Sequence, residues 1–288
     1  MFVMKTLKIR LVILSILLLG VIFSVYVAYR ETRNGILTVA FLDVGQGDAI
    51  WIESPNGNQM LIDGGPGKSV LRELSKVMPF YDRSIDVVVA THPDADHISG
   101  LNDVLNKYKV ALFVEPGVES DTAVYKELKN EVAAKNIKIV EARRGMLVDL
   151  GGRAVLEILF PVLDPTGMET NMASIVARLV YGENEFMLTG DSPKNIEEYL
   201  VSLEAQSQTL GSDVLKAGHH GSKTSSATSF VSAVSPEYAV ISAGKDNRYG
   251  HPNQEVLDIL TNFGAKILRT DEEGRIVFKS DGVNLEIK

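Results

Sequence analysis

The sequence contains no cysteine, one tryptophan and only five histidines among its 288 residues. The absence of cysteine excludes disulfides, thiolate metal ligands and a cysteine nucleophile. The sequence has no internal repeat and no low-complexity segment. Its hydrophobic content of 45% is enough for one large domain or two small ones.

A run of 18 uncharged residues, Leu11–Ala28, lies near the N-terminus. At about 1.5 Å per residue, a helix of this length is roughly long enough to span a bilayer core of about 30 Å. Basic residues before the run predict a cytoplasmic N-terminus and an exported remainder, although Arg30 and Arg33 weaken the asymmetry. We expect residues 1–33 to form a cytoplasmic stub and an uncleaved single-pass anchor. The alternative is a cleaved signal peptide, for which Tyr26-Val27-Ala28 is a poor cleavage site.

The two parts of the chain differ in charge. Residues 1–33 carry five basic side chains and one acidic side chain, which gives this segment a net charge of +4. The whole chain has a net charge of −8, so residues 34–288 have a net charge of −12. A domain this acidic does not bind nucleic acid through bulk electrostatics. A polyanionic substrate would have to be drawn by a local basic patch and by bound metal ions.

Residues 34–288 are predicted to form one domain of strands and helices. Strands are predicted at 36–43, 48–53, 59–63, 86–90, 110–114, 138–140, 154–160, 174–181, 185–189, 214–217, 238–241, 266–268, 275–279 and 283–287. Helices are predicted at 67–77, 98–107, 122–135, 193–203 and 253–262. This order favours an α/β fold of two face-to-face sheets with helices outside, because a single parallel sheet would not easily accommodate the hairpins.

The densest group of reactive side chains follows the predicted strand 86–90. His92, Asp94, Asp96 and His97 come directly after it, so their side chains are expected to share one small space. Imidazole suits Zn²⁺, carboxylate suits harder ions such as Mn²⁺, and the like charges would raise one another's pKa unless a cation lay among them. We therefore expect a site for two metal ions. The alternative is an exposed acidic turn with two incidental histidines.

The other histidines and two further aspartates also follow apolar stretches. His219, His220 and His251 lie beside glycine or proline, as in a loop that leaves a strand. Asp63 either orients a metal-ligand histidine or caps a turn. Asp191 either bridges two cations or caps the helix that follows it.

These motifs, taken in order, resemble the metallo-β-lactamase superfamily over about residues 35–288. The segments FLDVGQGDA, LIDGG, THPDADH, LTGD, HHGS and YGHP together resemble the hydrolase domain of the ComEC family of competence proteins. The resemblance implies an αββα four-layer sandwich with its metals at the edge between the sheets. In that family the domain is attached to a many-helix DNA-uptake channel. With one apolar run here, we expect the transport role not to carry over, and a DNA-uptake partner stays an open question.

The resemblance also implies a set of metal ligands. One ion would be held by His92 and Asp94, the other by Asp96, His97 and one of His219 and His220, with Asp191 as the bridge. Adjacent residues of an extended chain point to opposite sides, so we expect one histidine of the pair to be a ligand, with no choice between them.

One histidine that is usual in the superfamily is missing. Asn171 and Ser174 occupy its region, either as hydrogen-bond donors to phosphate or as an ordinary loop and strand start. The loss favours Mn²⁺ over Zn²⁺, because oxygen ligands suit the harder ion.

Two cations would lower the pKa of a bound water and hold the oxygens of a phosphodiester. We place Asp96 and His251 among the catalytic residues, with His251 protonating the leaving group or contacting the phosphate, unless it is only a loop histidine. Lys223, Lys245 and Arg248 are expected to bind phosphate or to be solvated. The prediction is an outward-facing metal-dependent phosphodiesterase or nuclease that acts on DNA or another phosphodiester.

Two other functions stay open. The acidic domain slightly favours hydrolysis of a non-nucleic ester: a phosphocholine ester, a lactone or a cell-wall phosphodiester. A degenerate member of the superfamily would be a non-enzymatic envelope binding protein, which the intact metal motifs oppose.

Overall fold

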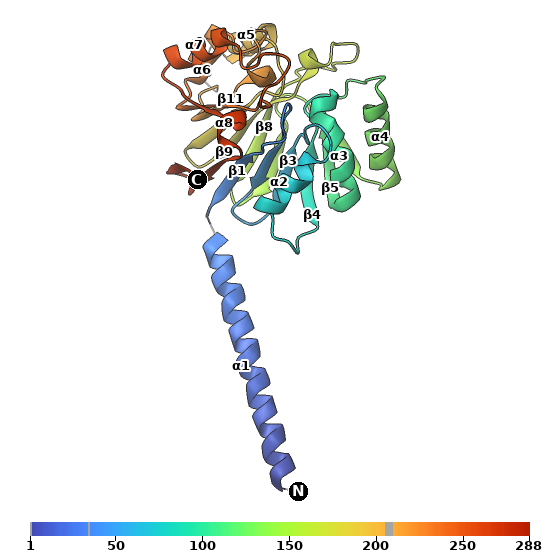
Figure 1. Cartoon of the computed structure of the whole chain (residues 1–288), viewed down its shortest axis with the longest axis vertical. Coiled ribbons are helices and arrows are strands. Elements are labelled where there is room, and N and C mark those ends of the chain that lie inside the picture. Colours follow the sequence, from blue (N-terminus) through green and yellow to red (C-terminus); the bar gives the residue numbers. More distant parts are fainter. Residues whose placement is uncertain (1, 34, 205–209) are drawn as a thin grey trace.

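The structure is a computed structural model that describes residues 2–33, 35–204 and 210–288. Two sheets lie face to face, and helices cover their outer faces (Figure 1). This arrangement confirms the predicted αββα sandwich. The predicted boundary between anchor and domain falls at residue 34, which lies outside the described residues, so the division into 1–33 and 34–288 stays a prediction.

The first sheet has the strand order β15-β14-β1-β2-β3-β4-β5-β6. Its strands are β1 (Leu37–Phe41), β2 (Ile50–Glu53), β3 (Gln59–Ile62), β4 (Ser84–Val89), β5 (Lys109–Glu115), β6 (Lys138–Glu141), β14 (Ile276–Ser280) and β15 (Leu285–Ile287). Three helices pack on its outer face: α2 (Ser69–Val77), α3 (Ala95–Lys107) and α4 (Ala123–Ala134).

The second sheet has the strand order β13-β12-β11-β10-β9-β8-β7. Its strands are β7 (Leu147–Gly151), β8 (Ala154–Phe160), β9 (Val176–Tyr181), β10 (Asn184–Leu188), β11 (Val214–Lys216), β12 (Tyr238–Ile241) and β13 (Lys266–Arg269). Its outer face carries α5 (Lys194–Glu204), α6 (Thr228–Val234) and α7 (Gln254–Asn262), and a short helix, α8 (Thr270–Glu273), follows β13.

Strand β1 illustrates how the sandwich is built from sequence. Val39 and Phe41 belong to the core between the sheets, whereas Ala40 packs in the layer under the helices. Successive side chains of a strand point to opposite faces, so a strand covered on both sides is apolar throughout. Between the sheets, the ring of Phe278 packs edge-on against Phe41 at 6.0 Å and Phe186 at 5.8 Å.

The sequence prediction missed three elements of the domain: β7, α6 and α8. Strand β7 is largely exposed and lies at the edge of its sheet, so it lacks the apolar alternation of a covered strand. Helix α6 follows the serine-rich segment Ser222–Ser226, which is typical of a loop. Helix α8 has only four residues, Thr-Asp-Glu-Glu, and no apolar periodicity.

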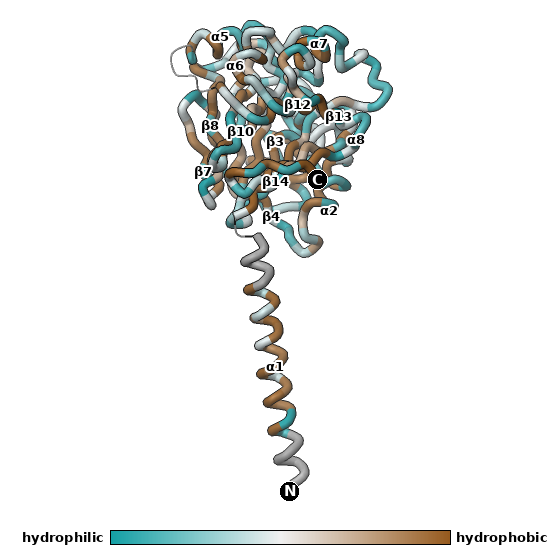
Figure 2. Tube along the Cα trace, turned by 90° about the vertical axis from the view of Figure 1, so that its left-hand side faces the viewer, coloured by the Kyte–Doolittle hydropathy of each residue, from teal (hydrophilic) through white to brown (hydrophobic). Residues whose placement is uncertain are grey.

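Helix α1 (Phe2–Arg33) extends away from the domain (Figure 1). Within it, Lys8–Val27 is long and apolar enough to cross a membrane, and none of this span is buried against the protein. Figure 2 shows hydrophobic residues along most of this length. The helix leads to the first residue of β1, at the edge of the sheet where β1, β4 and β5 begin.

Replacement of Phe278 tests the core between the sheets. Phe278→Ala is expected to lower the free energy of unfolding by about 3–5 kcal/mol, because a fully buried ring leaves a cavity. Urea unfolding of the full chain in detergent can be followed through Trp51, the single tryptophan, which is 1% exposed. The control Phe80→Ala removes a ring that is 85% exposed and should change the free energy of unfolding by less than about 0.5 kcal/mol. Equal unfolding midpoints would contradict this placement of Phe278.

Candidate metal centre

The candidate site lies where strands of both sheets end. Strands β3 and β4 run parallel in the first sheet, and β10 and β11 run parallel in the second. The residues that follow them therefore meet at one edge of the sandwich. Asp63 follows β3, His92 follows β4, and Asp191 follows β10. Nε2 of His97 lies 3.3 Å from Oδ2 of Asp191, so the two sheets contribute to a single site.

The His-x-Asp-x-Asp-His segment is a strand end that turns directly into a helix. α3 begins at Ala95, three residues earlier than predicted, so Asp96 and His97 lie in its first turn and Asp94 is its N-cap residue. Helical rise is shorter than strand rise, which keeps the segment compact. The rings of His92 and His97 are consequently only 4.1 Å apart between centroids.

Asp63 fixes the ring of His97. Its Oδ2 lies 2.8 Å from Nδ1 of His97, and its two carboxylate oxygens also accept hydrogen bonds from the amide and hydroxyl of Thr91. A carboxylate cannot donate, so Nδ1 of His97 carries a proton, and Nε2, which faces Asp191, is the atom that would bind a metal ion once it loses its own proton. This contact matches the orienting position that the sequence indicated for Asp63.

The structure distinguishes His220 from His219. Both residues have left-handed backbone angles, with φ of 48° for His219 and 55° for His220, so the extended backbone expected for the pair is wrong. His220 is buried; its Nδ1 lies 3.0 Å from the carbonyl of Ser242, and its Nε2 lies 3.4 Å from Oδ2 of Asp191. His219 is partly exposed, and its Nδ1 lies 3.0 Å from the hydroxyl of Thr224. His220 therefore lies inside the site. His219 lies nearer its mouth, with its Nε2 3.8 Å from the same Oδ2 of Asp191.

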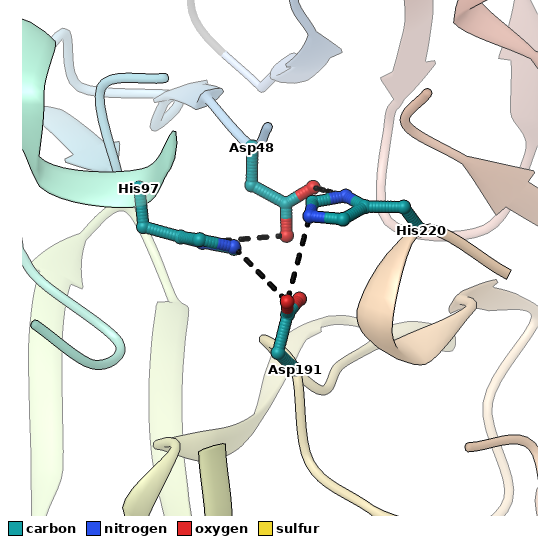
Figure 3. Close-up of side chains that lie close together, drawn as sticks. All are labelled: Asp48, His97, Asp191 and His220. Carbon is teal, nitrogen blue, oxygen red and sulfur yellow. Dashed lines mark ion pairs between the residues drawn. The ribbon is translucent and has the colours of Figure 1, made fainter. Parts of the chain in front are cut away.

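Asp48 is a site residue to which the sequence prediction gave no role. It forms, with His97, Asp191 and His220, a buried group whose ligand atoms all lie within 4.8 Å of one another (Figure 3). Gly47 has φ of 142°, and a Cβ there would lie 2.1 Å from the carbonyl oxygen of Asp96, so only glycine allows this close approach. Asp48 lies in the loop between β1 and β2, two residues before β2 begins.

Lys216 is the second residue that the sequence prediction missed. It is fully buried, its Nζ forms an ion pair with Asp48 and lies 3.8 Å from Oδ1 of Asp191, and it donates to the carbonyl of Gly190 at 2.9 Å. A lysine is almost never fully buried unless it is paired. Its position at the end of the apolar segment Val214–Leu215 was the available signal.

Several buried atoms of this group lack a hydrogen-bond partner within the part of the chain that the structure describes. They are Nε2 of His92, Nε2 of His97, Nε2 of His220, Oδ1 of Asp48 and Oδ1 of Asp191. Buried polar atoms are normally satisfied, and lone pairs from imidazole and carboxylate that converge are what a divalent cation accepts. The residues present therefore fit a metal centre.

Charge inside the site is balanced by the histidines and Lys216. Burial lowers the pKa of His92 to about 3, so this ring is neutral and ready to act as a ligand. Burial also acts to lower the pKa of His220, but Asp191, Asp48 and Asp96 outweigh it and raise that pKa to about 9. Burial raises the pKa of Asp191, yet His220 and His97 hold it well below its usual range.

The group opens to solvent through a pocket of about 210 Å³. The pocket is lined by Gln46, Asp94, Asp96, Asp191, His219, His220, Tyr249 and His251. The ring of His251 stacks on Tyr249 and lies 5.8 Å from that of His219, and its Nδ1 is buried with no hydrogen-bond partner among the described residues. Burial and the neighbouring His219 lower the pKa of His251, so the ring is neutral near pH 7.

Other predicted substrate contacts lie away from this pocket. Ser174 is buried, and its hydroxyl accepts a hydrogen bond from the amide of Asp191 at 3.3 Å, so it supports Asp191 instead of facing a phosphate. Asn171 lies in the short 3-10 helix Asn171–Ala173, outside the pocket lining. Lys223 and Lys245 are exposed and do not line the pocket, and Arg248 lies over the ring of Tyr249.

The fold and the site define a family. Residues 42–245 match the family described as the metallo-beta-lactamase superfamily, and the chain belongs to it.

The chain is also similar in sequence to three curated proteins. The chain is 32% identical over 262 residues to ComE operon protein 3 of Bacillus subtilis, covering 84% of this chain and 33% of that protein. It is 30% identical over 259 residues to competence protein ComA of Neisseria gonorrhoeae, and the match covers 88% of this chain and 34% of that protein. Recombination protein 2 of Haemophilus influenzae is 27% identical over 257 residues, with 86% and 29% covered. The chain thus spans about a third of the length of these relatives.

Solved structures agree on the fold. YhfI of Bacillus subtilis, a metallo-beta-lactamase fold protein, superposes with a TM-score of 0.56 at 12% identity, covering 85% of this chain and 99% of that one. Igni18 of Ignicoccus hospitalis, a metallo hydrolase, superposes with a TM-score of 0.54 at 15% identity. The match covers 84% of this chain and 98% of that one. At this identity the likeness concerns the fold alone.

The role of Asp48 can be tested by metal titration. Asp48→Asn would leave Lys216 buried without its partner, so the matched variant is the double replacement Asp48→Asn with Lys216→Met. Its affinity for Mn²⁺ and Zn²⁺ is expected to fall roughly 10- to 100-fold, because the support around His97 and His220 is lost. Calorimetric titration of the full chain in detergent measures it.

Asp43→Asn is the control for this experiment. Asp43 lies in the same loop, but among the described residues it accepts a hydrogen bond only from the amide of Gly45, at 3.3 Å, and it is not part of the buried group. Its metal affinity should be unchanged. Equal affinities in the control and the double variant would remove Asp48 and Lys216 from the metal centre.

Proposed function

We propose that the chain is a membrane-anchored, metal-dependent phosphodiesterase that cleaves DNA, with its domain on the outer side of the membrane. The observation that carries the proposal is the convergence of unpartnered imidazole and carboxylate atoms on one solvent-open pocket. The competence and recombination proteins among the relatives support DNA as substrate, since both names denote processes that handle DNA.

Two divalent ions would fit the ligand set. His92 and Asp94 would hold one, with Nε2 of His92 3.9 Å from Oδ2 of Asp94. Asp96, His97 and His220 would hold the other, and Asp191 would reach both. When bound, the ions would supply a nucleophilic water near neutral pH and Lewis acidity for phosphate oxygens.

The choice of metal follows from the ligand chemistry. Asp94, Asp96 and Asp191 offer carboxylate oxygens beside the imidazoles, and Asn171 and Ser174 contribute no imidazole. Oxygen-rich sites suit Mn²⁺ better than purely nitrogen-rich ones do. We therefore place Mn²⁺ ahead of Zn²⁺.

The protein's own groups complete the chemistry. Asp96, at the pocket wall, is positioned to accept the proton of an attacking water, since its carboxylate is partly exposed and Oδ2 lies 3.5 Å from Nε2 of His220. His251 is neutral, so its N–H can donate to a phosphate oxygen or to the leaving oxygen. Tyr249, stacked on His251, keeps that ring at the mouth of the pocket.

A second candidate is a hydrolase of a non-nucleic ester, such as a phosphocholine ester or a lactone. One observation favours it: the described residues that line the pocket include three aspartates and no lysine or arginine. A long polyanion usually meets basic side chains around a site. A short neutral or zwitterionic ester needs none.

Cleavage assays with ligand variants test the proposal. The full chain in detergent, loaded with Mn²⁺, should cut single- or double-stranded DNA, and chelation should stop the reaction until Mn²⁺ is restored. His92→Ala and Asp191→Ala should each lower the rate by about 10³-fold or more, because the ions supply several kcal/mol of transition-state stabilisation. Metal content by mass spectrometry, with about two ions per chain expected for a two-ion site, is measured on the same samples.

Asp258→Asn, an exposed carboxylate on α7, is the matched control and should keep full activity. Cutting that persists in both ligand variants would come from a contaminating nuclease and would sink the proposal. Bound metal with turnover of p-nitrophenyl phosphocholine or a lactone, but not DNA, would establish the second candidate. Bound metal without turnover of any of these substrates would indicate a non-enzymatic envelope binding protein.

A further inference from the structure

The edge of the domain that receives α1 is opposite the metal centre. The centre lies beyond the carboxyl ends of β3, β4, β10 and β11, whereas α1 leads into the first residue of β1, level with the start of β4. Figure 1 shows α1 leaving this lower edge of the domain. We call it the anchor edge.

An exposed aromatic pair stands on the anchor edge. Phe80 and Tyr81 lie in the loop between α2 and β4, with Phe80 85% and Tyr81 61% exposed. Their rings contact each other edge-on at 5.4 Å. Met78, which is buried in the layer under the helices, holds the start of the loop in place. Figures 1 and 2 show this loop on the side of the domain from which α1 leaves.

Exposed basic residues also lie on the anchor edge. Four exposed residues at the ends of α2 and α3 and the starts of β4 and β5 belong to this group: Lys76, Arg83, Lys107 and Lys109. The amide of Lys109 donates to the carbonyl of Arg83 at 2.9 Å, so these two lie side by side.

Acidic neighbours offset part of this charge. Nζ of Lys76 forms an ion pair with Glu73 at 2.6 Å, whereas Arg83, Lys107 and Lys109 form no ion pair within the part of the chain that the structure describes. Asp82 accepts hydrogen bonds from Ser84 and Gln59, and Asp86 accepts from the amide of Gln59. These hydrogen bonds hold both carboxylates against the protein without removing their negative charge. What distinguishes the anchor edge is that Arg83, Lys107 and Lys109 are exposed there beside the aromatic pair, in a domain whose overall charge is strongly negative.

We propose that the anchor edge rests on the bilayer, with Phe80 and Tyr81 in the headgroup region and the basic side chains on anionic lipid headgroups. The proposal rests on the proposed anchoring by α1, which brings this edge to the membrane surface. Aromatic rings favour the membrane interface, and each basic side chain near an anionic surface strengthens the contact several-fold. Docking would hold the metal centre facing away from the lipid.

Tryptophan fluorescence in lipid nanodiscs tests this contact. The full chain is placed in discs of phosphatidylcholine and phosphatidylglycerol, with or without lipids that are brominated near the glycerol. Phe80→Trp should lose fluorescence in the brominated discs. Leu163→Trp, at a 77% exposed residue that follows β8 at the opposite edge, should not. Trp51 is buried and supplies the baseline in the unsubstituted chain.

Phe23→Trp, within the apolar span of α1, reports the anchor separately. If Phe23→Trp is quenched and Phe80→Trp is not, the docking proposal is overturned while the anchor stands. If Phe23→Trp is unquenched, the anchor fails and docking fails with it. Equal quenching of Phe80→Trp and Leu163→Trp would mean that the domain has no preferred edge, which also overturns the proposal.

Charge reversal tests the basic residues. Arg83→Glu with Lys109→Glu, in the Phe80→Trp background, should lower the docked-to-undocked ratio about tenfold or more in anionic discs. The effect should be much smaller in pure phosphatidylcholine. Metal-dependent activity toward a small soluble ester should stay the same, because neither residue lines the pocket. Unchanged quenching in anionic discs would show that these basic side chains do not contribute to docking, which overturns the electrostatic part of the proposal.

Discussion

Compensation of buried charge is the constraint on which the candidate site depends. Asp48, Asp63 and Asp191 are buried together, and each unpaired carboxylate would cost several kcal/mol of desolvation. Lys216 supplies a fixed positive charge, and protonated histidines supply the rest when no metal is bound. Metal ligands must lose their protons to bind, so a divalent cation can replace two imidazolium protons with little change in the total charge of the site. The same side chains can thus keep the charge of the site nearly balanced with or without a metal ion.

This balance requires both sheets at once. Lys216 and Asp191 come from the second sheet, whereas Asp48 and His97 come from the first, and Lys216 pairs with Asp48 across the edge of the sandwich. The relative position of the sheets is set by the apolar core between them, in which Phe278 contacts Phe186 of the opposite sheet. A change in that core would displace the ligands relative to one another, because close-packed interiors transmit strain.

Much of this could be predicted from the sequence, and the limits have physical causes. Strand periodicity and the ordered motifs were enough for the αββα sandwich, because covered strands are apolar on both faces. The sequence motifs also indicated that His97, Asp191 and one of the histidines His219 and His220 would meet, because each motif follows an apolar strand. Asp48 and Lys216 were missed because a single carboxylate or lysine beside an apolar strand is a weak local signal, and its burial depends on partners more than 160 residues away. The choice between His219 and His220 depended on left-handed backbone angles that neighbouring residue types do not predict.

Strand β1 connects helix α1 with the candidate metal centre. α1 leads to its first residue, and the loop that carries Asp48 follows its last. Five residues of strand at about 3.4 Å each make a rigid spacer of about 17 Å. If α1 spans a bilayer as proposed, β1 would separate the lipid from the mouth of the pocket. Headgroups of the same membrane would then be out of reach, while a polymer that passes along the cell surface at that height would not. Substrates would thus be selected by their distance from the membrane before any chemical recognition occurs.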